Sequence, residues 1–391
     1  NFFTNAYAHG APCASFMQEK SALRHIIQIS ITLVALLTIP LVGWTSEKPT
    51  IRFKEIGEQA GVHFVPSSRQ FTGHKAQVLA MFTDGGCAVA VGDFNNDGFD
   101  DMVIGVPYED LGGSNQLVDA GIVTVAYGSA SGLTNPVNLH QYSPGVGTNS
   151  ESGDLFGAAL ASGDINGDGY DDVIVGVPGE GVGWGARAQS NAGAVHVIYG
   201  SASGASGTGS QWFYQNTPGW PGRAETNDRY GSSIAVSDID GDGIGDLVVG
   251  VPGEKLGNYT EAGQVQIRYN PGNWSQTPAS VQTLYQNVAG VQNKVETGDR
   301  FGSHLEMADV TGDGNIDLIV GVPGESIANR PNAGAVAIFK SVGGAITTAE
   351  DQILYANQSV FTGESEANAE FGLSFLIIGI FLVINFANSL K

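Results

Sequence analysis

The sequence has 391 residues, including 56 glycines and 15 prolines, and 42% of its residues are hydrophobic. This apolar content supports a folded core, so a wholly disordered chain is excluded, and the lack of a Gly-X-Y period excludes collagen. Lysine and arginine total 17 against 39 aspartates and glutamates, which gives a formal net charge of −22 at pH 7. A surface this acidic repels phosphate groups, so we expect no nucleic-acid partner. It also calls for counter-charge, which bound metal can supply.

The N-terminal part is typical of a targeting segment. Residues 1–16 precede Met17, and we interpret them as upstream read-through. A basic stretch and then an apolar run of 18 residues, Ile26 to Gly43, follow in the order of a secretory signal. We therefore predict a signal peptide or signal anchor over 17–46, and a secreted or cell-surface protein. The length of the apolar run leaves an uncleaved membrane anchor open.

From residue 85 to 370 the chain repeats one unit four times. The first aspartates of its acidic segments, Asp93, Asp164, Asp238 and Asp309, are spaced by 71, 74 and 71 residues. Each unit contains about four short strands, rich in β-branched residues and separated by Gly-rich turns. This pattern predicts an all-β fold in which each repeat is one blade of a β-propeller. Residues 47–84 precede the first unit and are expected to supply an edge or closing strand.

A fifth unit begins at Phe371 but does not continue. No acidic segment follows it, and the residues from Leu373 to Phe386 are almost all apolar. We interpret 371–391 as an aborted fifth repeat with an apolar tail. Contact with a membrane is expected only through this tail or through the N-terminal anchor.

The acidic segments follow the pattern D-x-[DNT]-x-D-G-x-x-D. Side-chain oxygens at positions 1, 3, 5 and 9, with the main-chain carbonyl of position 7, form the kind of ligand set that calcium prefers. Glycine at position 6 permits the sharp turn that such a loop needs. We predict about four structural Ca²⁺ sites. The predicted ligands are Asp93, Asn95, Asp97, Phe99 and Asp101 in the first loop; Asp164, Asn166, Asp168, Tyr170 and Asp172 in the second; Asp238, Asp240, Asp242, Ile244 and Asp246 in the third; and Asp309, Thr311, Asp313, Asn315 and Asp317 in the fourth.

Two other interpretations fit these loops less well. An EF-hand needs a glutamate at position 12 and flanking helices, whereas position 12 is Ile104, Val175, Val249 or Val320 and the flanks are predicted strands. Ordinary acidic turns are the other alternative, because Asp, Asn and Gly favour turns. Thirteen carboxylates in register would repel one another strongly without a cation, which favours the metal sites.

Two further motifs recur with the acidic loops. An aromatic–glycine pair opens the later repeats at 156–157, 230–231 and 301–302, and Gly-Val-Pro follows each loop, as at 105–107 and 176–178. Together these motifs resemble the FG-GAP repeats of integrin alpha chains and bacterial surface proteins, over about residues 85–372. The first repeat departs, with Gly85-Gly86 where Phe-Gly is expected.

The resemblance implies a calcium-stabilised propeller, usually of seven blades, that binds ligands on the face away from the calcium loops. The sequence supplies four full blades and an incomplete fifth. We therefore expect truncation from a seven-bladed parent, and an open ring or closure by a second chain remain alternatives.

No enzymatic constellation accompanies the repeats. Residues 128–132 and 200–204 read G-S-A-S-G, which places alanine where a nucleophile elbow has serine, and there is no Walker loop, H-E-x-x-H or C-x-x-C. We therefore expect no enzyme activity in this chain. Aromatic and arginine side chains on long loops are typical of interfaces. Trp184, Arg187, Trp220 and Arg223 are the candidates for the ligand face, although the tryptophans fit packing between blades equally well.

We thus predict an extracellular calcium-binding propeller that acts as an adhesion or recognition module for a protein or glycan ligand on its loop face. Two alternatives stay open. The propeller could be the accessory part of a secreted hydrolase whose catalytic domain is missing from this chain, or the sequence could be a non-functional gene fragment.

Overall fold

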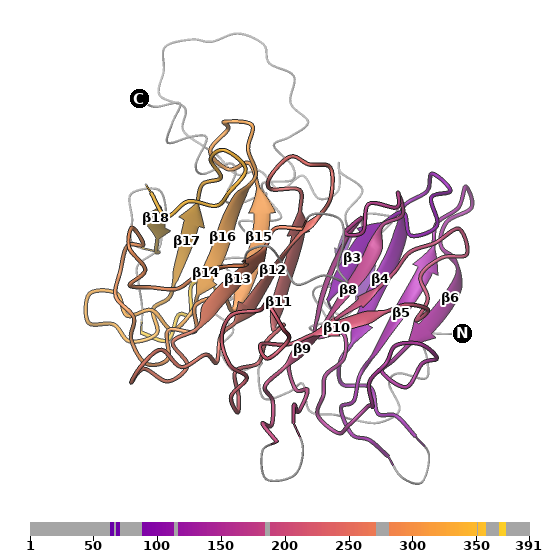
Figure 1. Ribbon diagram of the computed structural model, residues 1–391, viewed down its shortest axis with the longest axis horizontal. Helices are drawn as coiled ribbons and strands as arrows, with labels where there is room; N and C mark the ends of the chain where they lie inside the picture. Colours follow the sequence, from indigo (N-terminus) through magenta and orange to yellow (C-terminus); the bar gives the residue numbers. More distant parts are fainter. Residues whose placement is uncertain are drawn as a thin grey trace. The chain divides into compact units, whose positions relative to one another are not determined.

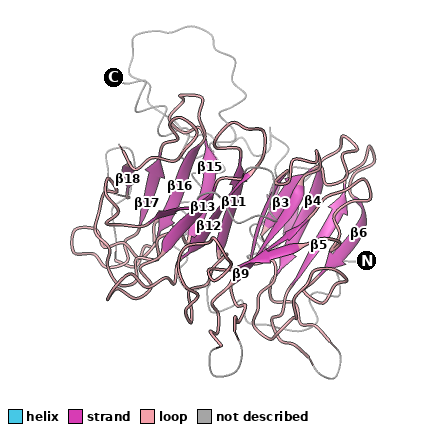
Figure 2. Ribbon diagram, viewed as in Figure 1, coloured by secondary structure: helices cyan, strands magenta, loops and turns pink. Residues whose placement is uncertain are grey.

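The computed structural model describes residues 63–65, 68–70, 88–112, 116–183, 188–270, 281–349, 351–356 and 367–372. These residues form strands, turns and bends (Figure 2), and none of them belongs to a helix long and apolar enough to cross a membrane. The predicted read-through and signal segments, and the tail beyond Gly372, lie outside the described residues. The chain divides into two compact units between Gly86 and Cys87.

In the first unit the structure describes one small hairpin, within the segment 47–84. Strand β1 (His63–Val65) pairs antiparallel with β2 (Ser68–Gln70), so that His63 lies opposite Gln70. The predicted role of this segment as an edge or closing strand stays a prediction.

The second unit contains four antiparallel sheets of four strands, each a simple meander in chain order (Figure 1). We call these sheets blades 1 to 4. Blade 1 consists of β3 (Val89–Gly92), β4 (Asp101–Val106), β5 (Ile122–Tyr127) and β6 (Thr134–Leu139), and blade 2 of β7 (Ala159–Gly163), β8 (Asp172–Val177), β9 (Ala194–Ile198) and β10 (Gln211–Phe213). Blade 3 consists of β11 (Ser233–Ser237), β12 (Asp246–Val251), β13 (Gln264–Arg268) and β14 (Val281–Leu284), and blade 4 of β15 (His304–Ala308), β16 (Asp317–Val322), β17 (Ala335–Phe339) and β18 (Gln352–Leu354).

The predicted all-β fold of four propeller blades is confirmed by these four sheets. The second strands β8, β12 and β16 read D-V-I-V-G-V, D-L-V-V-G-V and D-L-I-V-G-V, and every residue in them is buried. A strand with both faces covered needs apolar residues at successive positions rather than in alternation. The fourth strand is short and only partly buried, as in β10 and β14, because it lies at the outer edge of its blade.

The hydrophobic core lies between neighbouring blades. One cluster joins Val103 and Val125 of blade 1 to Val173 and Val175 of blade 2, all fully buried. Similar clusters join blade 2 to blade 3 and blade 3 to blade 4. The first strands of successive blades, β3, β7, β11 and β15, also contact one another in order. Each blade therefore buries its faces against its neighbours, as expected for repeats that are stabilised by stacking.

The aromatic–glycine pair fastens each blade to the one before it. The Phe156 amide donates to the Ala120 carbonyl of blade 1, while the Gly157 amide donates to the Gly176 carbonyl of blade 2. Gly157 has φ +90°, and a β-carbon on Gly105 would collide with the Gly157 carbonyl. Equivalent contacts recur at Tyr230-Gly231, Phe301-Gly302 and Phe371-Gly372. The motif thus places a side-chain-free backbone where two blades meet.

Replacing Gly157 by alanine should destabilise the protein more than a matched glycine change. A β-carbon there would lie 2.9 Å from the Ile122 carbonyl oxygen and 2.9 Å from Val123 Cγ1, whereas Gly298, at φ +87°, has nothing within 4 Å. Both Gly157→Ala and Gly298→Ala incur the left-handed penalty of about 1–2 kcal/mol. Gly157→Ala should lose about 1–3 kcal/mol more through overpacking. Urea unfolding of the full chain would show this, and equal losses would contradict it.

Candidate metal centre in the acidic loops

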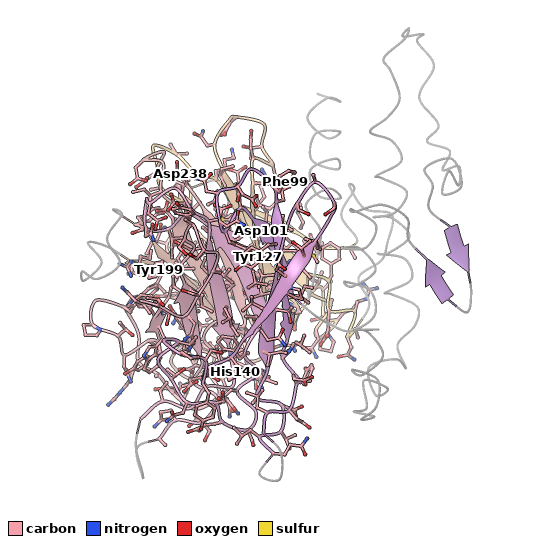
Figure 3. All side chains as sticks on the ribbon, turned by 90° about the vertical axis from the view of Figure 1, so that its right-hand side faces the viewer. Phe99, Asp101, Tyr127, His140, Tyr199 and Asp238 are labelled. Carbon is pink, nitrogen blue, oxygen red and sulfur yellow. The ribbon has the colours of Figure 1, made fainter. Side chains whose placement is uncertain are left out.

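The four acidic loops all lie at the same end of the blades. Each connects the first strand of its blade to the second: 93–101 in blade 1, 164–172 in blade 2, 238–246 in blade 3 and 309–317 in blade 4. In Figure 3 the labelled side chains Phe99 and Asp238 mark this end, and His140 lies toward the other. The predicted sites are therefore four copies of one structural position.

The first aspartate of each loop organises the turn. In the first loop the Asp93 carboxylate accepts the amides of Asp97 at 3.1 Å and Gly98 at 2.9 Å. The corresponding carboxylates of Asp164, Asp238 and Asp309 accept the same two amides in their own loops. These bonds wrap the backbone around the carboxylate. In the second, third and fourth loops Oδ1 accepts a further amide, from Gly167, Gly241 or Gly312, so Oδ2, which accepts one amide, is the oxygen that keeps a lone pair for a metal.

The side chains at positions 3 and 5 form Asx-type bonds within the loop. Oδ1 of Asn95 accepts the Asp97 amide at 3.0 Å, and Oδ1 of Asp97 accepts the Phe99 amide at 2.9 Å. The position-5 bond recurs to the amides of the other position-7 residues, Tyr170, Ile244 and Asn315. Coordination by the position-7 carbonyls stays a prediction.

The aspartate at position 9 has a structural role that the sequence pattern did not predict. Asp101, Asp172, Asp246 and Asp317 are all fully buried. One carboxylate oxygen of Asp101 accepts the Phe94 amide of the loop at 2.9 Å, and the other accepts the Gly128 amide, just beyond β5, at 2.7 Å. The other three blades repeat this arrangement. The carboxylate therefore links the acidic loop to the end of the third strand.

The third loop gathers carboxylates most closely. One carboxylate oxygen each from Asp238, Asp240 and Asp246 lies within 4.8 Å of the others, the one such group of three acidic, His or Cys side chains among the described residues. Position 3 is aspartate only in this loop; the others have Asn95, Asn166 or Thr311. Three hard oxygen ligands at this separation fit a calcium ion. Asp242 is not part of the group.

Burial and mutual repulsion raise the pKa values of the position-9 carboxyl groups. Burial is the largest cause for Asp172, whose pKa rises to about 7, and for Asp246, whose pKa rises to about 6. The neighbouring loop aspartates add to both shifts, and the bound backbone amides oppose them. The pKa values of Asp101 and Asp317 are raised for the same first reason. The backbone amides of the loops therefore compensate only part of the negative charge of the carboxylates. A bound cation would neutralise the remainder.

The prediction that Trp220 lies on the ligand face is wrong. Trp220 is only 6% exposed and packs between blades 2 and 3, with its ring centroid 5.9 Å from that of Phe213 and 6.0 Å from that of Tyr230. The Arg268 guanidinium lies 5.8 Å from the same ring. Arg223 is exposed as expected. The remaining two candidates, Trp184 and Arg187, lie outside the described residues.

Comparisons with known proteins agree with the repeat structure. A family model described as FG-GAP repeat matches residues 86–125, 156–198, 230–267 and 301–339. The phosphatidylinositol-glycan-specific phospholipase D of Dictyostelium discoideum is 32% identical over 224 residues, 53% of this chain and 22% of that protein. The Bos taurus protein of the same name is 33% identical over 174 residues, 43% of this chain and 18% of its own length.

An integrin alpha chain is also among the relatives. Integrin alpha-8 of Gallus gallus is 28% identical over 232 residues, 57% of this chain and 19% of that protein. The chain therefore spans about a fifth of the length of the curated relatives it matches.

With divalent cations chelated, the stability of the protein should fall as the pH rises from about 4 to about 7. Asp172 and Asp246 keep protons in this window when folded and lose them when unfolded, because their folded pKa values are raised. The folded state then binds more protons, so deprotonation favours unfolding. Melting temperatures in EDTA across this range test the prediction. A stability that climbs steadily with pH would contradict it.

Proposed function

Because four segments between residues 86 and 339 match the FG-GAP repeat model, we propose that this chain is a calcium-stabilised β-propeller that recognises a protein or glycan ligand outside the cell. The repeat matches and the four blades are the premise, and the calcium, the ligand and the location are the proposal. The observation that carries it is the convergence of Asp238, Asp240 and Asp246 in one loop, repeated in pattern by the other three.

The metal that suits these loops is a hard divalent cation. The candidate ligands are all oxygen atoms, from carboxylates, amides and main-chain carbonyls, which calcium accepts in sets of six to eight. Magnesium requires a tighter octahedral set and keeps its waters, so it suits a nine-residue loop of this kind less well. The third loop should bind calcium most tightly, because affinity rises with the number of charged ligands.

A structural role for the metal follows from the surroundings of the ligands. The position-9 carboxylates are buried and bonded to amides from the loop and from beyond the third strand, as with Asp101 and Gly128. A cation held there would fix the loop to the blade and leave little room for a substrate. A metal that binds only the folded state contributes about 2.7 kcal/mol per site at a hundredfold excess over its Kd.

Recognition outside the cell is supported by the relatives. The integrin alpha and phospholipase D proteins that the chain matches are extracellular or cell-surface proteins. Arg223, in the segment between blades 2 and 3, is exposed and available to a ligand. It lies at the end of the blades away from the acidic loops, because it follows a fourth strand.

A second function is favoured by a different observation. Phospholipase D proteins from two organisms match at 32% and 33% identity, and the aligned part is about a fifth of each. The chain could therefore be the accessory propeller of a secreted hydrolase. In that case the chemistry would reside in a catalytic region outside the matched residues.

The recognition proposal predicts calcium-dependent ligand capture. The full chain, immobilised on a surface, would be probed with arrays of glycans and extracellular matrix proteins in calcium and in EDTA. We expect one ligand class to bind in calcium, binding to fall at least tenfold on chelation, and Arg223→Ala to weaken it. Arg229→Ala is the matched control, since Arg229 is exposed nearby. Capture of no ligand, or equal binding by both variants, would overturn the recognition role.

A further inference from the structure

A second set of acidic residues recurs at the opposite end of the blades. It lies at the three junctions between successive blades, and none of its members belongs to the acidic loops. Each junction combines a glutamine after the fourth strand of one blade with an E-x-x-D segment and the glutamate of Gly-Val-Pro-Gly-Glu from the next. These junction clusters are Gln141, Glu151, Asp154 and Glu180; Gln215, Glu225, Asp228 and Glu254; and Gln286, Glu296, Asp299 and Glu325. His140, beside the first cluster, marks this end in Figure 3.

Backbone and side-chain contacts bring the members of each cluster together. In the first, Gln141 Nε2 donates to Glu180 Oε2 at 2.5 Å, which joins blade 1 to blade 2. The Gly179 amide donates to the Asp154 carbonyl, which places Glu180 beside Asp154. The same glutamine–glutamate bond recurs at 2.6 Å and 2.5 Å in the other two junctions.

Several buried oxygen atoms in the clusters have no hydrogen-bond donor. Gln141, Gln215 and Gln286 are at most 2% exposed, and Oε1 of each is buried with no hydrogen-bond partner. In the third junction Oδ1 of Asp299 is also buried and unpartnered, while its Oδ2 accepts the Glu296 amide at 2.5 Å. Each of these side chains thus uses one polar atom within the protein and keeps a buried oxygen free. Such oxygens are costly to bury without a donor or a cation.

Among the described residues, no basic side chain is paired with an acid of these clusters. The charged neighbours that act on Asp154 and Glu180 are carboxylates, and with burial they raise the pKa values to about 7 and about 8. The ion pairs among the described residues, Arg300 with Glu370 and His304 with Glu306, leave the buried acids of all three junctions without a basic partner. Buried carboxylates are normally paired with a cation or bound to a metal.

We propose that each junction cluster binds one calcium ion between neighbouring blades. In the first junction the ligands would be the carboxylates of Asp154 and Glu180 and the Oε1 atom of Gln141. The donor set consists of oxygen atoms only, which selects a hard cation. The ligands come from both sides of the junction, so the ion joins two blades, whereas a loop ion would lie within one. This inference is independent of the proposed recognition function.

The position after blade 4 lacks two of the residues that recur in the three junction clusters, so it serves as an internal comparison. After blade 4, Ala356 stands where the junction glutamine is expected, and Ala369 stands two residues before Phe371, where the aspartate is expected. Two of the ligand positions are therefore lost together. Three junction ions are expected, and none between blade 4 and the start of the fifth repeat.

The full chain, stripped with chelator and re-equilibrated, should bind seven calcium ions by mass spectrometry of the metal: four in the loops and three at the junctions. The double variant Asp228→Asn with Glu254→Gln should bind six, and the control Glu261→Gln, an exposed acid on the same side, should bind seven. Four ions in both wild type and double variant would overturn the proposal and show that protons alone satisfy the clusters. A count of three that the double variant reduces to two would instead overturn the loop sites and keep the junction sites.

Stability provides a second readout for variants that bind poorly or fold weakly. In EDTA, Glu254→Gln should melt above the wild type, because it removes a buried uncompensated charge. In calcium this advantage should disappear or reverse, because the variant has also lost a ligand. A variant that melts above the wild type equally in both buffers would overturn the junction site.

Discussion

A buried aspartate at the start of the second strand connects that strand to the acidic loop and to the end of the third strand in each blade. Asp101 in blade 1 accepts one amide from the acidic loop and one from the residue that follows the third strand, and the other blades repeat the arrangement. Removing a carboxylate from water is costly, and two amides compensate only part of that cost. The pKa of its counterpart Asp172, about 7, reflects the remaining imbalance. A cation in the loop would compensate the remaining negative charge. The geometry of the loop, the stability of the blade and the binding of metal therefore all depend on this buried carboxylate.

Buried carboxylates whose negative charge is only partly compensated lie at both ends of the blades, with different consequences at each end. At the loop end the acidic residues are close in sequence and belong to one blade. At the junction end, Gln141 and Glu180 come from neighbouring blades, and the close packing of Gly157 against Gly105 holds those blades together. Cations at the two ends would therefore stabilise different parts of the structure. Those in the acidic loops would order individual blades, and those at the junctions would hold neighbouring blades together. A net charge of −22 is compatible with both.

The sequence predicted the features that depend on local interactions. The strands follow from β-branched runs between glycine-rich turns, and the loop bonds of Asp93 join residues four and five positions apart. Features that depend on distant contacts were missed. Asp101 pairs with Gly128, 27 residues away, and Gln141 with Glu180, 39 residues away. Trp220 is a candidate for the ligand face because it is an aromatic residue on a long loop, and the sequence leaves packing between blades equally open. The packing of blade 2 against blade 3 shows that it is buried.

Calorimetric titration of calcium into the chelator-treated chain tests the central claim most directly, with Asp240→Asn and Asn166→Asp as a reciprocal pair. Asp240→Asn removes one carboxylate from the third loop, and Asn166→Asp adds one at the same position of the second. We expect the first to weaken the tightest site about tenfold, or about 1.4 kcal/mol, and the second to create another tight site. Absence of calcium binding, or identical isotherms for all three proteins, would contradict calcium coordination by the acidic loops.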